Sequence, residues 1–278
     1  MNPAIWFALA ASVLFGLSTP VAKMLLDSVS PVLLSGLLYL GSGVGLFVVR
    51  LWRDRGWQAT GLRPGEWPWL LGAIVFGGVL GPVALMVGLQ HTAGATASLL
   101  LNLEGVLTAV LAWVAFKENA DRRVVLGMMT IVAGGLILSW PEKGAAQTGL
   151  DWGAGLIVLA CLCWAIDNNL TRKVSASDAL FIAGSKGLVA GCVNVTLAIG
   201  LGTAWPTLPT TLGAMAVGLL GYGISLVMFV LALRGLGTAR TGAYFSVAPF
   251  IGALVIIPFC KGRRSRNFKQ PWPTAVWV

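Results

Sequence analysis

The chain has 278 residues, of which 57% are hydrophobic and only 10% are charged. Soluble proteins carry about 25% charged residues, so the composition excludes an ordinary soluble domain. The apolar residues form long continuous runs, whereas a transmembrane β-barrel has short alternating segments. We therefore predict an all-α polytopic membrane protein. The formal net charge of +9 does not indicate a nucleic-acid partner, because the basic residues fall between apolar runs, as membrane topology requires.

Nine apolar segments approach the length of about 20 residues that a helix needs to cross a bilayer. They cover residues 4–26, 31–51, 67–89, 95–116, 122–140, 152–171, 178–201, 210–233 and 238–257. Pro20, Pro82 and Pro249 lie inside segments, where proline is expected to kink or interrupt a helix. Small residues predict close helix packing at Gly41-xxx-Gly45, Gly77-xxx-Gly81 and Gly187-xxx-Gly191.

The positive charges predict the orientation in the membrane. If the N-terminus is cytoplasmic, almost all loop lysines and arginines fall on the cytoplasmic side, and only Lys23 and Lys143 fall outside. The cytoplasmic set is Arg50, Arg53, Arg55, Arg63, Lys117, Arg122, Arg123, Arg172, Lys173, Arg234 and Arg240. Cytoplasmic loops carry an excess of such residues, so we predict a multi-pass protein of the cytoplasmic (inner) membrane with its N-terminus inside.

An internal repeat organises the chain. Residues 232–255 follow the pattern of residues 88–111, with Asn102 opposite Ser246 and Gly105 opposite Pro249. Residues 15–20 line up loosely with residues 164–169, so the unit contains five helices. Because five is odd, two copies in one chain must have opposite orientations. Inverted repeats are the architecture of many secondary transporters, whose binding site lies where the halves meet. The predicted repeats are residues 1–141 and 150–257.

Two five-helix repeats predict ten helices, and the tenth is missing after Val255. Residues 258–278 form a basic tail that would put positive charge on the outer side, against the pattern of the rest of the chain. We expect this tail to be aberrant, for instance from an altered reading frame or a damaged gene. The alternative is a nine-helix protein with a basic tail.

Four stretches carry a family resemblance: residues 15–23 (FGLSTPVAK), 101–104 (LNLE), 112–118 (AWVAFKE) and 246–249 (SVAP). With the repeat pattern, they resemble EamA-type permeases of the drug/metabolite transporter superfamily, to about residue 255. The resemblance implies ten helices in two inverted halves around a central cavity, and movement, often outward, of amino acids, other metabolites or toxic compounds. The sequence departs from the family at Gly105, since Glu-Pro is common there.

Glu104 is the leading site candidate, within the same segment as Asn102. A carboxylate at the bilayer centre costs at least ~2.5 kcal/mol, so Glu104 should face protein or water. In a functional interpretation it faces the cavity and binds a cationic group or carries a coupling proton. In a structural interpretation it accepts hydrogen bonds from Asn or Ser on neighbouring helices. The sequence leaves both open.

Asp167 and Lys186 are expected at comparable depth, because a helix rises about 1.5 Å per residue and the two lie near one turn between segments. An ion pair with a structural role is the favoured interpretation, and Asn168 extends this polar patch. Ser18 and Tyr244 complete the substrate-binding or coupling candidates. Tyr244, Tyr222 and Trp164 either line a cavity or serve packing.

Several chemistries lack their motifs. The chain has no Gly-xxxx-Gly-Lys-Ser/Thr loop for ATP, no His-Glu-x-x-His, and one histidine, His91. Cys161 and Cys163 have no neighbouring histidine or further cysteine, so we expect neither a zinc site nor a cofactor. The sequence favours a secondary transporter, not an enzyme, whose partners are a small-molecule substrate, the lipid bilayer and a coupling proton. The rival is a membrane-embedded enzyme or a non-transporting scaffold.

Overall fold

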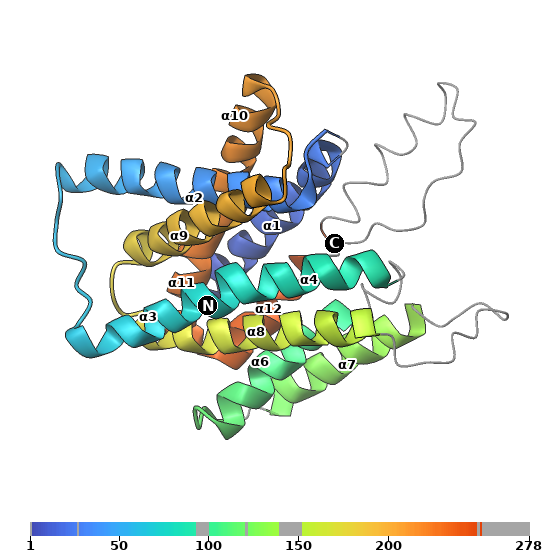
Figure 1. The fold of residues 1–278 in the computed structure, drawn as a ribbon. Coiled ribbons are helices and arrows are strands. Elements are labelled where there is room, and N and C mark those ends of the chain that lie inside the picture. The colour runs from blue at the N-terminus through green and yellow to red at the C-terminus, as the bar shows by residue number, and fades with distance from the viewer. Residues whose placement is uncertain are drawn as a thin grey trace, which may run out of the picture.

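The computed structural model describes residues 2–26, 28–92, 100–119, 122–138, 152–248 and 251, in which the regular elements are helices, joined by turns and loops, with no strand among them. Figure 1 shows the helices lying against one another as a bundle. In the first part of the chain they are α1 (Pro3–Leu25), α2 (Pro31–Asp54), η1 (Pro64–Glu66), α3 (Trp67–Ala73), η2 (Ile74–Leu80), α4 (Gly81–His91), α6 (Leu103–Val114) and α7 (Arg122–Leu138). In the second they are α8 (Trp152–Val174), α9 (Ala179–Gly200), α10 (Leu208–Val217), η3 (Gly218–Ile224), α11 (Ser225–Leu236) and α12 (Thr238–Phe245).

Six helices are long and apolar enough to span a membrane: Pro3–Ala22, Pro31–Asp54, Pro64–Leu85, Trp152–Val174, Ala179–Gly200 and Leu208–Leu236. They coincide with six of the nine predicted segments, which confirms an all-α polytopic membrane protein. The other three predicted segments, 95–116, 122–140 and 238–257, each include residues outside the described ranges. The expected missing tenth helix and the basic tail at 258–278 also lie outside the described residues.

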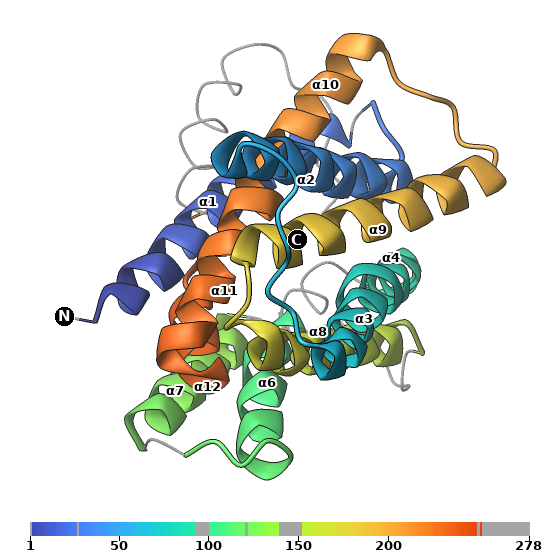
Figure 2. The same ribbon diagram turned by 90° about the vertical axis from the view of Figure 1, so that its left-hand side faces the viewer.

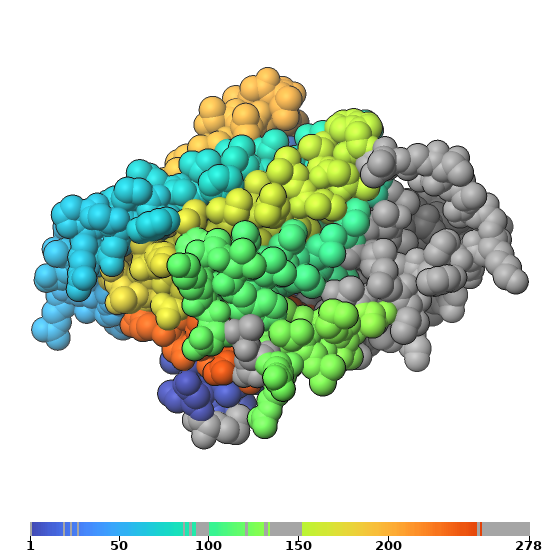
Figure 3. Space-filling view, turned by 90° about the horizontal axis from the view of Figure 1, so that it is seen from below, coloured from blue at the N-terminus to red at the C-terminus, as the bar shows by residue number. Residues whose placement is uncertain are grey.

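Large apolar side chains cover the outer surface of the bundle. Val114 on α6 is 75% exposed and Leu126 on α7 is 70% exposed. Figure 3 shows the surfaces of α3, α8, α6 and α7 on one face of the molecule. Contiguous apolar surface of this kind marks contact with lipid or protein rather than with water. This apolar surface is therefore suited to contact with the lipid of a bilayer.

The two halves of the sequence meet most closely where α2 crosses α9 (Figure 2). A Cβ added to Gly187 would lie 2.6 Å from the backbone nitrogen of Gly43, and one added to Gly191 would lie 2.5 Å from that of Leu40. Such contacts exclude any larger residue, because lipid-embedded helices approach closely only through small residues. The close packing predicted at Gly187 and Gly191 is confirmed.

The other two small-residue motifs also lie at helix contacts. Gly41 and Gly45 of α2 pack against Met215 and Leu219, and Gly77 and Gly81 pack against Asp167 and Trp164 of α8.

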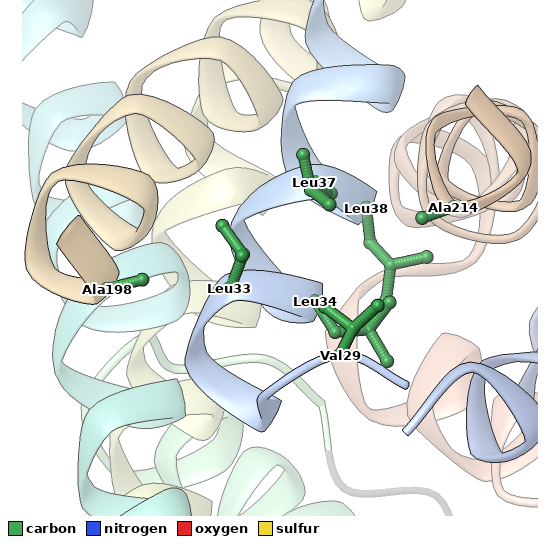
Figure 4. Packing of buried hydrophobic residues seen from close by; sticks show 7 residues of the cluster. All are labelled: Val29, Leu33, Leu34, Leu37, Leu38, Ala198 and Ala214. Carbon is green, nitrogen blue, oxygen red and sulfur yellow. The ribbon is translucent and has the colours of Figure 1, made fainter. Parts of the chain in front are cut away.

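Figure 4 shows how α2 fills the space between α9 and α10. Its leucines point to both sides, with Ala198 of α9 on one side and Ala214 of α10 on the other. The buried members of this cluster are Val29, Leu33, Leu34, Leu37, Leu38, Ala198 and Ala214. Leucine on one helix faces alanine on its neighbours, so large and small side chains interdigitate where α2 packs between α9 and α10.

Two of the spanning helices contain a π-helical segment between two α-helical parts. The helix α3–η2–α4 is π-helical at Ile74–Leu80, and the helix α10–η3–α11 is π-helical at Gly218–Ile224. Pro82 follows the first segment within the opening turn of α4, so the interruption predicted there takes the form of a change in helix type. By contrast, α1 continues through Pro20, and Pro249 lies outside the described residues.

Most of the predicted cytoplasmic loops meet at one end of the bundle. Arg50 at the end of α2 bonds to Asp178 before α9, and Arg234 at the end of α11 bonds to the backbone of Ser175. At the other end, His91 of α4 packs on Trp152 of α8, with ring centroids 4.3 Å apart. The loops after Arg50 and after Arg172 therefore share one end, as the predicted topology requires.

Candidate functional site

Glu104 lies in the first turn of α6, not in the middle of a long helix as the sequence suggested. The chain makes a turn at Asn102, and the regular helix runs only over Leu103–Val114. Leu100 and Leu101, which precede the turn, are also helical, so Glu104 lies just after an interruption between two helical stretches.

Two asparagines of α8 form hydrogen bonds with residues of α6. The Asn168 side-chain amide donates to Glu104 Oε1 at 3.2 Å and to Thr108 Oγ1 at 3.3 Å. The Asn169 amide donates to the backbone oxygens of Thr108 and Ala165 at 3.1 and 2.9 Å. Glu104 is thus tied to the second half of the sequence by a neutral donor, as the structural interpretation expected, while its side chain stays half-buried.

The expected ion pair between Asp167 and Lys186 is present. Lys186 Nζ lies 2.5 Å from Asp167 Oδ1 and also donates to Thr171 Oγ1 at 3.0 Å, while the Thr171 hydroxyl donates to Asp167 at 2.9 Å. The two charged side chains are only 5% and 11% exposed. Pairing and additional hydrogen bonds are what offset the high cost of burying both charges. Gly77 packs directly on the Asp167 carboxylate, where any side chain would collide.

Aromatic rings lie beside these polar groups. Tyr39 of α2 packs on Tyr222 of η3 with centroids 5.8 Å apart, Tyr222 packs on Phe15 at 5.4 Å, and Phe15 packs on Phe245 at 5.4 Å. All four rings are half-buried. A Cβ added to Gly105, the residue after Glu104, would lie 3.2 Å from Oγ of Ser246, the residue after Phe245, so the ring cluster and the carboxylate belong to one region of the interior.

Among the described residues, no hydrogen bond or ring contact joins the remaining predicted candidates to Glu104. Ser18 is buried, donates to the backbone oxygen of Phe15 in its own helix at 2.7 Å, and packs on Gly221. Tyr244 is 36% exposed on α12. Trp164 donates from Nε1 to the Gly77 oxygen at 3.1 Å, which stabilises the π-helical segment. The structure therefore joins Glu104 to Asn168 and Asp167 to Lys186, on α6, α8 and α9, whereas the Ser18 hydroxyl bonds within its own helix.

A cluster that the sequence did not reveal lies at the basic end of the bundle. Asp178 accepts a hydrogen bond from Arg50 Nε at 2.8 Å and from Arg53 Nη2 at 2.8 Å. We call Arg50, Arg53 and Asp178 the latch, because α2 and the α8–α9 loop are joined there. Burial alone would raise the Asp178 pKa, but the bonds from Arg53 and Arg50 outweigh it and lower that pKa below its ordinary 3.8. The only sequence signal was the basic charge of the two arginines.

The latch borders an open pocket of about 560 Å³, which Arg53, Ser177, Asp178 and Arg234 help to line. Arg50 itself is 1% exposed and packs over the Trp57 and Phe181 rings, at 5.4 and 5.5 Å from their centroids.

Glu118 is a second residue whose role the sequence did not show. Its carboxylate accepts bonds from the Thr238 backbone N–H at 2.9 Å and from the Thr238 hydroxyl at 3.0 Å, so the loop after α6 caps the N-terminus of α12. Gly237 permits this approach, because its φ of 79° is rarely adopted by L side chains and an added Cβ would lie 3.1 Å from the Glu118 carboxylate.

Comparison with known proteins identifies the family. The sequence profile of the EamA-like transporter family matches residues 2–140. The chain belongs to the EamA-like transporter family. The resemblance stated from four short motifs is therefore confirmed, and family membership supports a transporter role.

Curated relatives agree with this assignment. An "uncharacterized transporter" of Methanothermobacter thermautotrophicus is 28% identical over 88% of this chain and 76% of its own length. The "uncharacterized inner membrane transporter YedA" of Escherichia coli K12 is 24% identical over 88% of this chain and 79% of its own. A "probable 4-amino-4-deoxy-L-arabinose-phosphoundecaprenol flippase subunit ArnE" of Pseudomonas fluorescens is 31% identical over 37% of this chain and 89% of its own.

One solved crystal structure superposes with a TM-score of 0.79, covering 98% of this chain and 90% of that chain at 18% sequence identity. At this identity the similarity shows a shared fold alone. The relatives that carry functional names are named as transporters or as a flippase subunit, in line with a protein that is not an enzyme.

Proposed function

We propose that the chain is a secondary transporter that moves small organic molecules across the cytoplasmic membrane by alternating access. The observation that carries the proposal is Glu104, a half-buried carboxylate inside a bundle matched to lipid, bonded across the boundary between the two halves of the sequence to Asn168. Ionisable residues in the membrane interior are costly and usually mark substrate or proton pathways.

The proposed architecture is two inverted five-helix repeats, residues 1–141 and 150–257. The paired π-helical segments support it. Gly77 is the fourth residue of η2 and packs on Asp167, while Gly221 is the fourth residue of η3 and packs on Ser18. The sequence repeat aligns Ser18 with Asp167, so both halves use the same contact at the same place.

Alternating access requires that each end of the bundle can open in turn. The latch supports a state in which the basic end is closed, because Asp178 of the second repeat is bonded to two arginines of the first. Inward opening would separate these groups. The excess of positive charge at this end supports a cytoplasmic location for it, and so for the N-terminus.

In this mechanism Glu104 is the group for which substrate and a coupling proton compete. Its Oε1 is held by Asn168, which keeps the carboxylate oriented without neutralising it. Loading from the cytoplasm and release outside would make the protein an exporter, as the family resemblance implies.

The test is a panel of amines, amino acids and neutral metabolites in proteoliposomes, measured with and without a pH gradient. We expect at least one compound to be transported, and Glu104→Gln to abolish its transport while the protein remains in the membrane. Asp54→Asn is the control, because Asp54 bonds to Arg53 within its own helix, away from Glu104. Unchanged transport in Glu104→Gln would refute the role of this carboxylate.

A further inference from the structure

The charges of the membrane interior do not balance. Lys186 and Asp167 form a closed pair in which Thr171 bonds to both partners, and both charged side chains are buried. Glu104 has no counterpart of this kind, since none of the ion pairs in the described part of the chain includes it. The net charge that this region presents to a ligand is therefore the negative charge of Glu104.

The Glu104 carboxylate also has unused bonding capacity. Oε1 accepts one hydrogen bond from the Asn168 amide, and Oε2 accepts none within the residues that the structure covers. Four described polar atoms are both fully buried and without a hydrogen-bond partner, and Oε2 is not one of them. It is therefore an accessible acceptor, which a positively charged donor would satisfy best because charge-assisted hydrogen bonds are the strongest.

The half-buried rings of Tyr39, Tyr222 and Phe15 lie in the same region. Aromatic faces attract cations through the ring quadrupole and pack favourably against apolar or aromatic bodies. Among the side chains that the structure describes in this region, a substrate carboxylate would find no free cation, because Lys186 is already held by Asp167 and Thr171. An amino acid would bring such a carboxylate close to that of Glu104.

We infer that the substrates are organic monocations, amines with an apolar or aromatic body and no carboxylate. The ammonium group bonds to Glu104 Oε2, and the body of the molecule packs against Tyr39 and Tyr222. The inference rests on the proposed transport function and narrows its substrate class.

Four matched probes test the inference on the full chain purified in detergent: phenethylamine (a cation), phenylalanine (a zwitterion), 3-phenylpropionate (an anion) and 2-phenylethanol (neutral). Binding is measured by isothermal titration calorimetry. We expect phenethylamine to bind at least tenfold more tightly than each of the other three. Glu104→Gln should remove this preference, whereas Glu104→Asp, which keeps the charge, and the control Asp54→Asn should retain it.

Tyr222→Leu provides a variant that leaves the carboxylate intact. It should weaken phenethylamine binding several-fold while the cation stays preferred over the anion. The inference is overturned if phenylalanine or phenylpropionate binds as well as phenethylamine, if no probe binds, or if the preference survives in a monodisperse Glu104→Gln protein.

Parallel uptake assays separate this failure from failure of the proposed function. If phenylalanine is transported in a Glu104-dependent manner without a preference for amines, the inferred substrate class is wrong, and the proposed transport function is retained. If phenethylamine binds through Glu104 but none of the probes crosses the membrane, the proposed transport function is refuted, and the inferred binding specificity is retained.

Discussion

Asp178→Asn should open the basic end of the bundle. Asp178 is the carboxylate nearest to Arg50, at 2.8 Å, and Asp54 is the next, at 3.8 Å. Removing one partner of a buried pair costs about 3–5 kcal/mol, because the other charge is left uncompensated. The asparagine oxygen still accepts a hydrogen bond from a charged donor, which retains about 1.5–3 kcal/mol. The net loss of about 2 kcal/mol shifts the closed–open equilibrium about thirtyfold.

Pulsed electron–electron double resonance measures this shift between nitroxides at Trp52→Cys and Ala176→Cys, two exposed positions on either side of the latch, with the native cysteines replaced. We expect a longer-distance population to appear in Asp178→Asn. Asp54→Asn removes the same charge but no bond between the halves, so its distance distribution should match the parent protein. Identical distributions in all three proteins would refute the latch.

The same measurement has a predicted pH dependence. The Asp178 pKa lies below its ordinary value of 3.8, since the bonds from Arg53 and Arg50 outweigh the effect of burial. A lowered pKa adds stability that is present above the ordinary value and is lost as pH falls through the lowered one. The latch should therefore stay closed across about pH 5 to 8 and loosen only in stronger acid. Opening with a midpoint near neutrality would contradict this assignment.

Three further predictions concern stability. Lys186→Met should destabilise the protein by about 3–5 kcal/mol by leaving a buried charge, and adding Asp167→Asn should restore most of the loss; thermal unfolding without such rescue would argue against the pair. Gly77→Ala should lower the unfolding temperature, since its methyl group would strike the Asp167 carboxylate, whereas Gly213→Ala, with no neighbour within 4 Å, should not. Glu118→Ala should cost about 1 kcal/mol and speed hydrogen exchange in the first turn of α12; unchanged exchange would contradict the cap.

Features governed by length and composition could be predicted from the sequence. Apolar runs located the six long helices, and small residues at four-residue spacing located the close contacts, including Gly187 against Gly43. The pairing of Asp167 with Lys186 followed from helix rise and from the cost of an isolated charge in lipid. Each of these predictions rests on local geometry or on the free-energy cost of a lone charge in lipid, which ion pairing avoids.

Features that depend on hydrogen-bond register could not be predicted. A π-helical segment such as Ile74–Leu80 is as apolar as the α-helix around it, so composition does not reveal it. The turn at Asn102, which moves Glu104 into the first turn of a helix, has no proline and no glycine at its own position. The latch and the bond from Thr238 to Glu118 join residues 120 or more positions apart, and no local pattern encodes them.

The π-helical segments restrict which changes in chain length the fold can absorb. A π-helical turn accommodates one residue more than an α-helical turn. Deleting one residue from Ile74–Leu80 would therefore let this segment continue as plain α-helix while α4 keeps nearly the same orientation relative to α3. Ala84 and Leu85 would then stay packed with Ile157 of α8. The segment Ile74–Leu80 is therefore a place where this helix can lose one residue and still bury the same face.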